Sequence, residues 1–187
     1  RTLPPLVRAG EHALELGAGT TDLAVFHEGK IRHLGTIPYG GNAVTSDLVQ
    51  GLGITNHDAE QLKEAYGCAY EPMVDAEQVI AMPASASHAE RHISRELMSH
   101  IIHQRMDEIF DKVQREVQTA GFAGRLNAGI VLTGGGAALE GVSELAADVF
   151  GLGVRVGIPG DNVGGLVEQI AEPRFSTAVG LALYGAH

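Results

Sequence analysis

Residues 15–22, ELGAGTTD, lie between two runs of alternating apolar residues and combine groups that could bind a phosphate. The bend is built from small and hydroxyl-bearing residues, namely Gly17, Ala18, Gly19, Thr20 and Thr21. Their backbone N–H groups and two hydroxyls can surround a terminal phosphate. Because Mg²⁺ prefers oxygen ligands and keeps part of its water shell, Glu15 and Asp22 are predicted to hold Mg²⁺ through water or to orient an attacking water. On this stretch alone, a decorated β-hairpin is an equal alternative.

A second glycine cluster, TGGGAAL at 133–139, follows a predicted buried strand and precedes a predicted helix. This context favours a ligand at the carboxyl end of the strand. The predicted contacts are Gly134, Gly135, Gly136 and Ala137. The spacing fits neither the P-loop nor the dinucleotide-binding fingerprint. The alternative is a close crossing of helix and strand that tolerates only glycine.

Glu60 and Lys63 are three residues apart, so they share one face of a predicted helix. A carboxylate and an ammonium there could hold ribose hydroxyls and the edge of a purine. A solvated helix face is the alternative, since exposed ion pairs are common and contribute little. The nine histidines show no spacing typical of metal ligands.

Bulk composition narrows the class of protein. The chain has 187 residues, is 44% hydrophobic and carries a formal net charge of -10, which argues against nucleic-acid binding. The single cysteine, Cys68, excludes an internal disulfide and fits a reducing compartment. No apolar run reaches the roughly 18 residues of a membrane span. Because the chain begins with Arg1, we expect it to be a piece of a longer protein.

Periodicity predicts the elements that position these residues. Alternating apolar residues predict antiparallel strands at 12–16, 23–26 and 31–37. Helices are expected after Gly40 and Gly41 and again up to a stop at Gly67. A strand at 77–82, a loop and a long helix follow; the helix starts between Ser87 and Ser94 and ends at Gly121. The apolar strand before the second glycine cluster, a helix after it, a strand VRVGIP, a loop DNVGGL and a closing helix complete an α/β chain.

The order of these pieces resembles the second half of the actin/Hsp70 ATPase superfamily. Four stretches, IPYGGNAVTSDLVQGLG, DAEQLKEAYGCA, GIVLTGGGAALEG and EPRFSTAVGLALYG, resemble the FtsA family, a bacterial actin relative of the division septum. The resemblance covers residues 14–185. It implies half of an actin-like, ribonuclease H-like ATPase: a mixed sheet with flanking helices and a smaller inserted α+β subdomain. Residues 1–52 and 125–187, with a closing helix at 173–185, would face the nucleotide, and 53–124 would be inserted.

The resemblance also implies an ATP/ADP and Mg²⁺ site. Residues 17–21 would surround the β- and γ-phosphates, Gly40 and Gly41 would approach the ribose and phosphates, and residues 134–137 would pass beneath the adenosine. Glu60 and Lys63 would flank it. The family usually has Asp where this chain has Glu15, and often Gly where it has Ala18. A displaced carboxylate impairs hydrolysis more than binding, so weak or no ATPase activity is expected, and none from this piece alone.

By the same resemblance, the protein would tether the FtsZ ring to the cytoplasmic membrane at midcell, help to recruit other division proteins and self-associate into actin-like filaments. The family's first phosphate loop would precede Arg1, and a membrane-targeting helix would follow His187. The carboxyl-terminal tail of FtsZ would bind the inserted subdomain at Arg95, Ile101 and Arg105, where an arginine fork can hold a peptide oxygen.

Two other assignments remain open on the sequence. One is another member of the superfamily, such as a pilus-assembly platform or a rod-shape actin. The second is half of a sugar or acid kinase, which would need an acceptor-binding domain and a catalytic base elsewhere.

Overall fold

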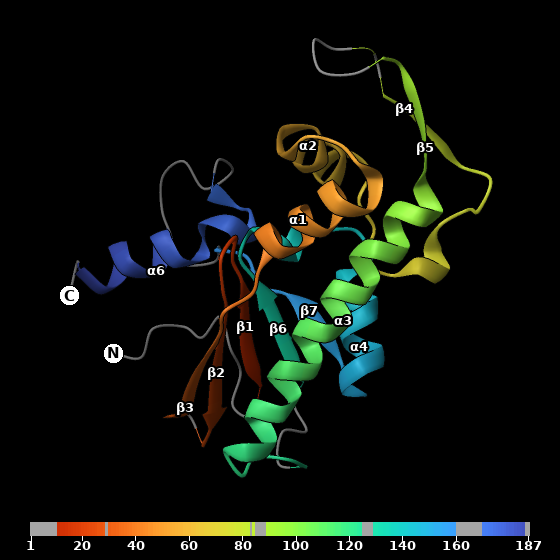
Figure 1. Cartoon of the computed structure of the whole chain (residues 1–187). Helices are drawn as coiled ribbons and strands as arrows, with labels where there is room; N and C mark the ends of the chain where they lie inside the picture. Colours follow the sequence, from red (N-terminus) through yellow and green to blue (C-terminus); the bar gives the residue numbers. More distant parts are fainter. Residues whose placement is uncertain are drawn as a thin grey trace.

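A five-stranded mixed sheet forms the base of the molecule (Figure 1). The computed structural model describes residues 11–28, 30–82, 84, 89–124, 129–159 and 170–185. The strand order is β3-β2-β1-β6-β7; β1, β2 and β3 pair antiparallel, whereas β6 pairs parallel to β1 and to β7. The bounds are β1 His12–Leu16, β2 Thr21–His27, β3 Lys30–Ile37, β6 Ile130–Thr133 and β7 Val154–Val156.

The burial of each strand follows its sequence pattern. Along β1 and β2, buried residues alternate with half-buried ones, so one face of this hairpin is packed. All four residues of β6 are buried, as its unbroken apolar run predicted. The predicted strands at 12–16, 23–26 and 31–37 are therefore confirmed.

Helix α3 crosses the packed face of the sheet and organises the helical layer (Figure 1). It contacts α1 and α4, and α1 in turn contacts α2. The bounds are α1 Gly41–Leu52, α2 Asn56–Tyr66, α3 Arg95–Thr119 and α4 Val142–Phe150, with short 3-10 turns η1 Glu71–Met73 and η2 Gly135–Ala138. The helices predicted after Gly41 and before Gly67 are confirmed.

The hairpin of β4 (Val79–Met82) and β5 (Arg91–Ser94) projects from the amino-terminal end of α3 (Figure 1). Strand β5 was not predicted, because its four residues, RHIS, contain one apolar side chain and show no clear alternation. Ser94 caps α3 by accepting a hydrogen bond from the Leu97 N–H, so the helix begins at the later of the two predicted starts. Ser87 and the predicted loop DNVGGL lie outside the described residues.

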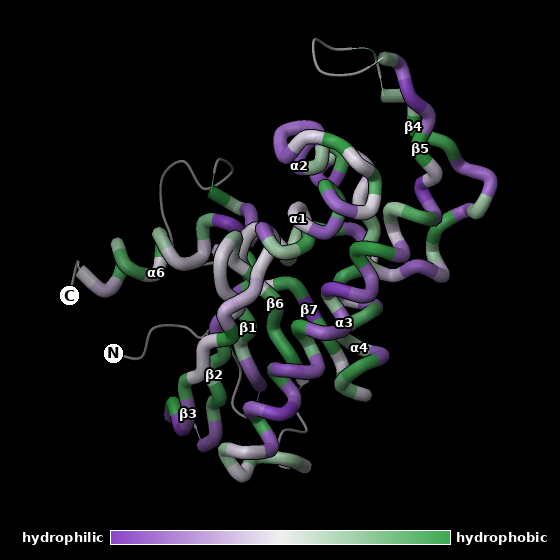
Figure 2. The backbone as a smooth tube through the Cα atoms, viewed as in Figure 1, coloured by the Kyte–Doolittle hydropathy of each residue, from purple (hydrophilic) through white to green (hydrophobic). Residues whose placement is uncertain are grey.

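The end of the long helix and the start of the closing helix differ slightly from their predicted positions. Helix α3 ends at Thr119, just before the predicted stop at Gly121. The closing segment starts as a 3-10 turn, η3 Pro173–Phe175, and continues as α6 Ser176–Gly185. Helix α6 extends away from the sheet and carries apolar residues (Figures 1 and 2), yet none of its residues is buried. None of the helices in the described ranges has both the length and the apolar character of a membrane span.

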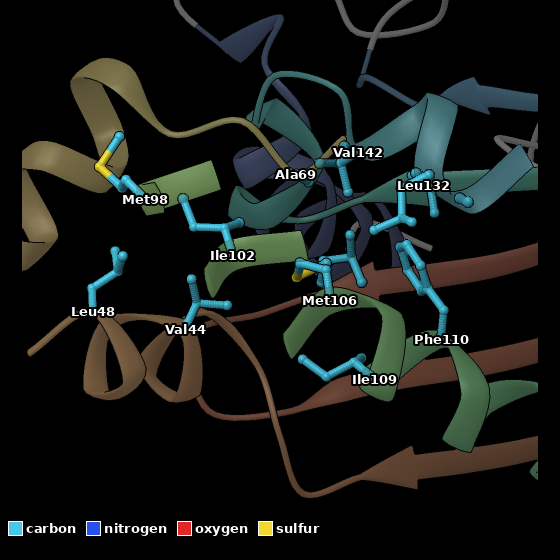
Figure 3. Close-up of a cluster of buried hydrophobic side chains, with 14 of the residues drawn as sticks. Val44, Leu48, Ala69, Met98, Ile102, Met106, Ile109, Phe110, Leu132 and Val142 are labelled. Carbon is cyan, nitrogen blue, oxygen red and sulfur yellow. The ribbon is translucent and has the colours of Figure 1, made fainter. Parts of the chain in front are cut away.

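The core lies between α3, α1 and the sheet (Figure 3). One stripe of α3 faces it, with buried residues at helical spacing: Met98, Ile102, Met106, Ile109, Phe110 and Val113. Val44 and Leu48 of α1 lie across from this stripe, and Leu132 of β6 belongs to the same cluster. A single helix therefore contributes to the core along most of its length.

Truncation of this stripe is expected to destabilise the whole fold. Ile102 is 0% exposed, so Ile102→Ala should lower the free energy of unfolding by about 2–5 kcal/mol through lost burial and a residual cavity. Leu97, 47% exposed on the same helix, is the control, and Leu97→Ala should cost under about 1 kcal/mol. Urea unfolding followed by circular dichroism measures both, and equal losses would contradict the packing described.

Candidate functional site

A cavity of about 480 Å³ opens at the carboxyl ends of β1 and β6. The β1–β2 turn, the starts of α1 and η2, and parts of α2 and α3 surround it. Nine residues predicted from the sequence line it: Gly17, Ala18, Thr21, Gly40, Gly41, Glu60, Lys63, Gly135 and Gly136. Segments far apart in the sequence therefore converge on one volume.

The β1–β2 turn is bonded directly to the start of α1. The Gly41 and Asn42 N–H groups donate to the Gly17 and Ala18 carbonyl oxygens at 3.0 and 2.8 Å. A Cβ on Gly40 would lie 2.4 Å from the Gly17 oxygen, so this approach requires glycine. The first amides of α1 are thus used by the turn. Among the described residues, no hydrogen bond is found from the N–H groups of Ala18 or Gly19, which leaves two donors for an anion.

The hydroxyls of the turn are engaged within the protein. Thr21 is 0% exposed and donates to the Tyr39 carbonyl at 3.0 Å. Thr20 and Thr36 donate to the two oxygens of Asp22 at 3.0 and 2.6 Å. The predicted donors to a phosphate on this turn are therefore its amides more than its hydroxyls.

Glu15 and Asp22 face one another across the β1–β2 pair, on the half-buried face of the sheet. Two carboxylates placed opposite each other repel. Hydroxyl donors offset this: Thr177 of α6 donates to Glu15 at 2.5 Å, as the threonines described above do to Asp22. Neither carboxylate lines the cavity, and Gly19, Thr20, Gly134 and Ala137 do not line it either. No cluster of three or more His, Cys, Asp or Glu side chains suited to a metal occurs in the described ranges.

Glu60 and Lys63 form the polar wall contributed by α2. The Lys63 ammonium donates to the Gly41 carbonyl at 3.2 Å and to Thr45 and Glu60 at 2.8 Å each. Thr45 also donates to Glu60. Burial alone raises the pKa of Glu60, but the hydrogen bonds from Lys63 and Thr45 outweigh it and leave the pKa below its usual value. Both residues line the cavity, with the Lys63 side chain 12% exposed and the Glu60 side chain 40% exposed.

Within the second glycine cluster, some glycines pack closely against β1 and another lines the cavity. A Cβ on Gly134, whose φ is +81°, would lie 2.6 Å from the Leu16 oxygen, and one on Gly136 would lie 2.8 Å from the Leu16 Cβ. These two glycines allow η2 to cross the end of β1 closely, as the alternative explanation proposed. A Cβ on Gly135 would meet nothing within 4 Å, and Gly135 lines the cavity.

Several residues of the lining were not predicted. Asn42 follows the predicted glycine pair, Glu64 follows Lys63, and Arg174 belongs to the stretch EPRF, so proximity in sequence was the available signal. Met106 and Ile109 of α3 gave none, since their apolar spacing indicates core. Three of the four lining carboxylates form ion pairs, Glu60 with Lys63, Glu140 with Arg95 and Glu172 with Arg174. Lys63 and Arg174 are the two cations in the described lining, so the lining carries more negative than positive side chains.

The three residues predicted for a partner make internal contacts. Arg95 donates to the Tyr66 carbonyl and to Gln78 and Glu140. Arg105 holds both oxygens of Asp47 at 2.5 and 3.0 Å and donates to Glu108 at 2.5 Å, and its hydrogen bonds with Asp47 raise its pKa. Ile101 packs over Gly51 of α1. These contacts join α3 to α1 and α2.

The sequence matches a known family along most of its length. The family model for cell division protein FtsA matches residues 12–180. The chain is 40% identical over 172 residues to cell division protein FtsA of Pseudomonas aeruginosa and 38% identical over 183 residues to that of Escherichia coli K12. These matches cover 92% and 94% of this chain but 41% and 43% of the relatives. The chain therefore spans about two fifths of their length.

Solved structures share the fold at low sequence identity. The PilM-PilN type IV pilus biogenesis complex matches with a TM-score of 0.70 at 20% identity, over 95% of this chain and 47% of that one. MreB 5 of Spiroplasma citri bound to AMPPNP matches with a TM-score of 0.67 at 20% identity, over 99% and 58%. These neighbours confirm the actin-like fold expected from the sequence.

The joint between the turn and α1 can be tested by adding one methyl group. Gly40→Ala should place a Cβ against the Gly17 and Ala18 oxygens and break their bonds to α1, lowering the free energy of unfolding by about 2 kcal/mol or more. Gly19→Ala is the matched control, since its Cβ would meet nothing within 4 Å. Urea denaturation measures the free energy of unfolding of both variants. A Gly40→Ala protein as stable as the wild type would contradict the close contact between the turn and α1.

Proposed function

The chain belongs to the FtsA family of cell division proteins, and we propose that it forms part of an ATP- and ADP-binding cleft. The convergence of both glycine clusters with Glu60 and Lys63 on one cavity carries this proposal. Structural neighbours solved with nucleotide, MreB 5 bound to AMPPNP and MreB5 bound to ADP, support it.

The residues present fit a nucleotide. The Ala18 amide lies in the lining and the Gly19 amide lies next to it in the same turn, and both would donate to the β- and γ-phosphates, as donors in such a bend do. Lys63 and Glu60 would bind ribose hydroxyls and the edge of the purine, and the open space at Gly135 would admit the adenosine. Because carboxylates outnumber cations in the described lining, a bound triphosphate calls for a cation. Glu15 and Asp22, which lie outside the lining, would hold Mg²⁺ through water.

Turnover is expected to be slow. Glu15 stands where the family usually has Asp, and its carboxylate is held by Thr177 of α6. A carboxylate shifted by one methylene misplaces the water that it orients, and reaction rates are sensitive to such shifts. The proposal is therefore binding with weak or no hydrolysis, and none by this piece alone.

In the cell, the proposed role is to tether the FtsZ ring to the cytoplasmic membrane at midcell and to help recruit the division machinery. Self-association into filaments is proposed from the shared actin-like fold. This role rests on the family to which the chain belongs.

The proposed dock for the FtsZ tail is the amino-terminal half of α3. Leu97 and Tyr66, 47% and 44% exposed, offer apolar surface near Arg95. A guanidinium has five N–H groups, and the described contacts of Arg105 with Asp47 and Glu108 use three of them. Arg105 would use the others for an oxygen of the peptide, with Ile101 beside it.

Nucleotide binding is tested by filling the open space at Gly135. Gly135→Leu should lower ATP affinity by about tenfold or more, because the side chain takes up cavity volume. Gly153→Leu is the matched control, since Gly153 also has nothing within 4 Å and lies outside the cavity. Calorimetric titration of the intact protein with ATP measures both. Unchanged affinity in Gly135→Leu would place the nucleotide elsewhere.

The partner proposal is tested with two substitutions that break the same internal ion pair. Arg105→Glu should weaken binding of a fluorescent FtsZ tail peptide by about tenfold, the scale of a charge-assisted hydrogen bond. Asp47→Asn removes the salt bridge but keeps the guanidinium, so it should bind as well as the wild type or better. Fluorescence anisotropy measures the affinities. Equal losses in both variants would assign Arg105 a purely structural role.

A further inference from the structure

A buried threonine of α1, Thr45, lies directly behind the polar wall of the cavity. It is 2% exposed and is not among the described lining residues, whereas Glu60 and Lys63 are. Helix α1 packs against α2 (Figure 1), and the Thr45 hydroxyl reaches both of these side chains across the contact between the helices. Thr45 therefore acts on a ligand only through the two residues that line the cavity.

The bonds within this group use all the hydrogen-bond donors of the Lys63 side chain. An ammonium has three N–H groups. Lys63 directs them to the Gly41 carbonyl at 3.2 Å and to the Thr45 hydroxyl and Glu60 Oε2 at 2.8 Å each. Lys63 therefore places its charge near a ligand but has no N–H left for one.

Glu60, in contrast, keeps one oxygen for a ligand. Lys63 and Thr45 both bond to Oε2, and among the described residues no hydrogen bond reaches Oε1. Burial acts to raise the pKa of Glu60, but the hydrogen bonds from Lys63 and Thr45 leave the pKa below its usual value, so the carboxylate is ionised at physiological pH. An ionised carboxylate only accepts hydrogen bonds, so the group that it binds must be a donor, as a ribose hydroxyl is.

The Thr45 hydroxyl has one proton and two nearby acceptors. One is the Gly41 carbonyl at 3.0 Å, four residues earlier in α1, which is a common local bond of a threonine in a helix. The other is Glu60 Oε2, on the neighbouring helix. Because an ionised carboxylate is the stronger acceptor, we assign the proton to the bond with Glu60.

We propose that Thr45 is a positioning residue for nucleotide binding, which holds Glu60 Oε2 so that Oε1 accepts a hydrogen bond from a ribose hydroxyl. The inference rests on the proposed function of the cavity, and it narrows the ribose contact to Glu60. The Lys63 ammonium, the Thr45 hydroxyl and Glu60 Oε2 bond to one another in a closed ring, so the carboxylate is ordered before a ligand arrives. Without the hydroxyl, Lys63 is the one described group that holds Glu60 Oε2.

Two nucleotides that differ only in the ribose test this role in the intact protein. ATP carries both ribose hydroxyls, whereas 2′,3′-dideoxy-ATP carries neither. Calorimetry should show the wild type binding ATP about tenfold or more tightly than the dideoxy analogue, the effect of a hydrogen bond to a charged acceptor. The ratio of the two affinities is the readout for every variant.

Thr45→Val keeps the shape of the side chain and removes the hydroxyl, so the ratio should fall to about threefold or less. Thr45→Ser returns the hydroxyl and should keep the ratio of the wild type. Thr119→Val is the matched control, since Thr119 of α3 makes the same bond to the carbonyl four residues earlier, outside the cavity, and its ratio should not change. In a Glu60→Gln background, Thr45→Val should lower the ratio no further, because the two residues act through one contact.

Both nucleotides are measured on the same protein, so a loss of stability in a variant does not alter the ratio. An unchanged ratio in Thr45→Val would overturn the positioning role and leave Thr45 a helical threonine bonded to Gly41. Equal binding of the two nucleotides by the wild type would overturn the contact of Glu60 with the ribose, while nucleotide binding itself would stand. Binding of neither nucleotide by the wild type would overturn the proposed function, and this inference with it.

Discussion

The candidate site depends on the contact between the β1–β2 turn and the first residues of α1. Two carbonyls of the turn, from Gly17 and Ala18, accept the first amides of α1, and glycine at position 40 permits this approach. The contact fixes where α1 starts, and thus where the Gly41 carbonyl lies. Lys63 donates to that carbonyl, so the position of α2 is tied to the sheet through a chain of three hydrogen-bonded segments.

Helix α3 provides the second constraint, because it packs along nearly its whole length. Its amino-terminal half meets β5 and η1, its middle meets α1, and its carboxyl-terminal half lies over β2 and β3. The ion pair of Arg105 with Asp47 adds a polar tie to the apolar seam with α1. Two cavities border α3, with Met106 and Ile109 lining the candidate site and Val113 and Val117 lining a second cavity.

Sequence patterns predicted the elements where periodicity was strong. The bounds of the strand at 12–16 were predicted correctly, because buried and half-buried residues alternate along it. Strand β5 was not predicted, because its sequence shows no such alternation. Part of each glycine cluster lines one cavity together with Glu60 and Lys63, and the role of these residues in nucleotide binding stays a prediction. The division of the chain at 52 and 125 stays a prediction.

Long-range contacts were beyond the sequence. The bond of Thr177 to Glu15 joins residues 162 positions apart, and no local pattern announces it. Likewise, the buried Nδ1 of His12, which has no hydrogen-bond partner among the described residues, follows from packing of the whole molecule, because the same histidine at an exposed strand end would simply be hydrated. Spacing identifies which residues share a face, but it does not say which polar groups will find partners.

Close backbone packing and access for a ligand, the two explanations for the second glycine cluster, apply to different positions within it. At Gly134 and Gly136, close approach to Leu16 excludes a side chain, which is a packing requirement. At Gly135, no neighbour excludes one, so packing gives no reason for glycine there. A side chain at this position would take up volume in the cavity that Gly135 lines. Gly134 and Gly136 let the backbone pass close to β1, and Gly135 leaves the adjoining cavity volume unfilled.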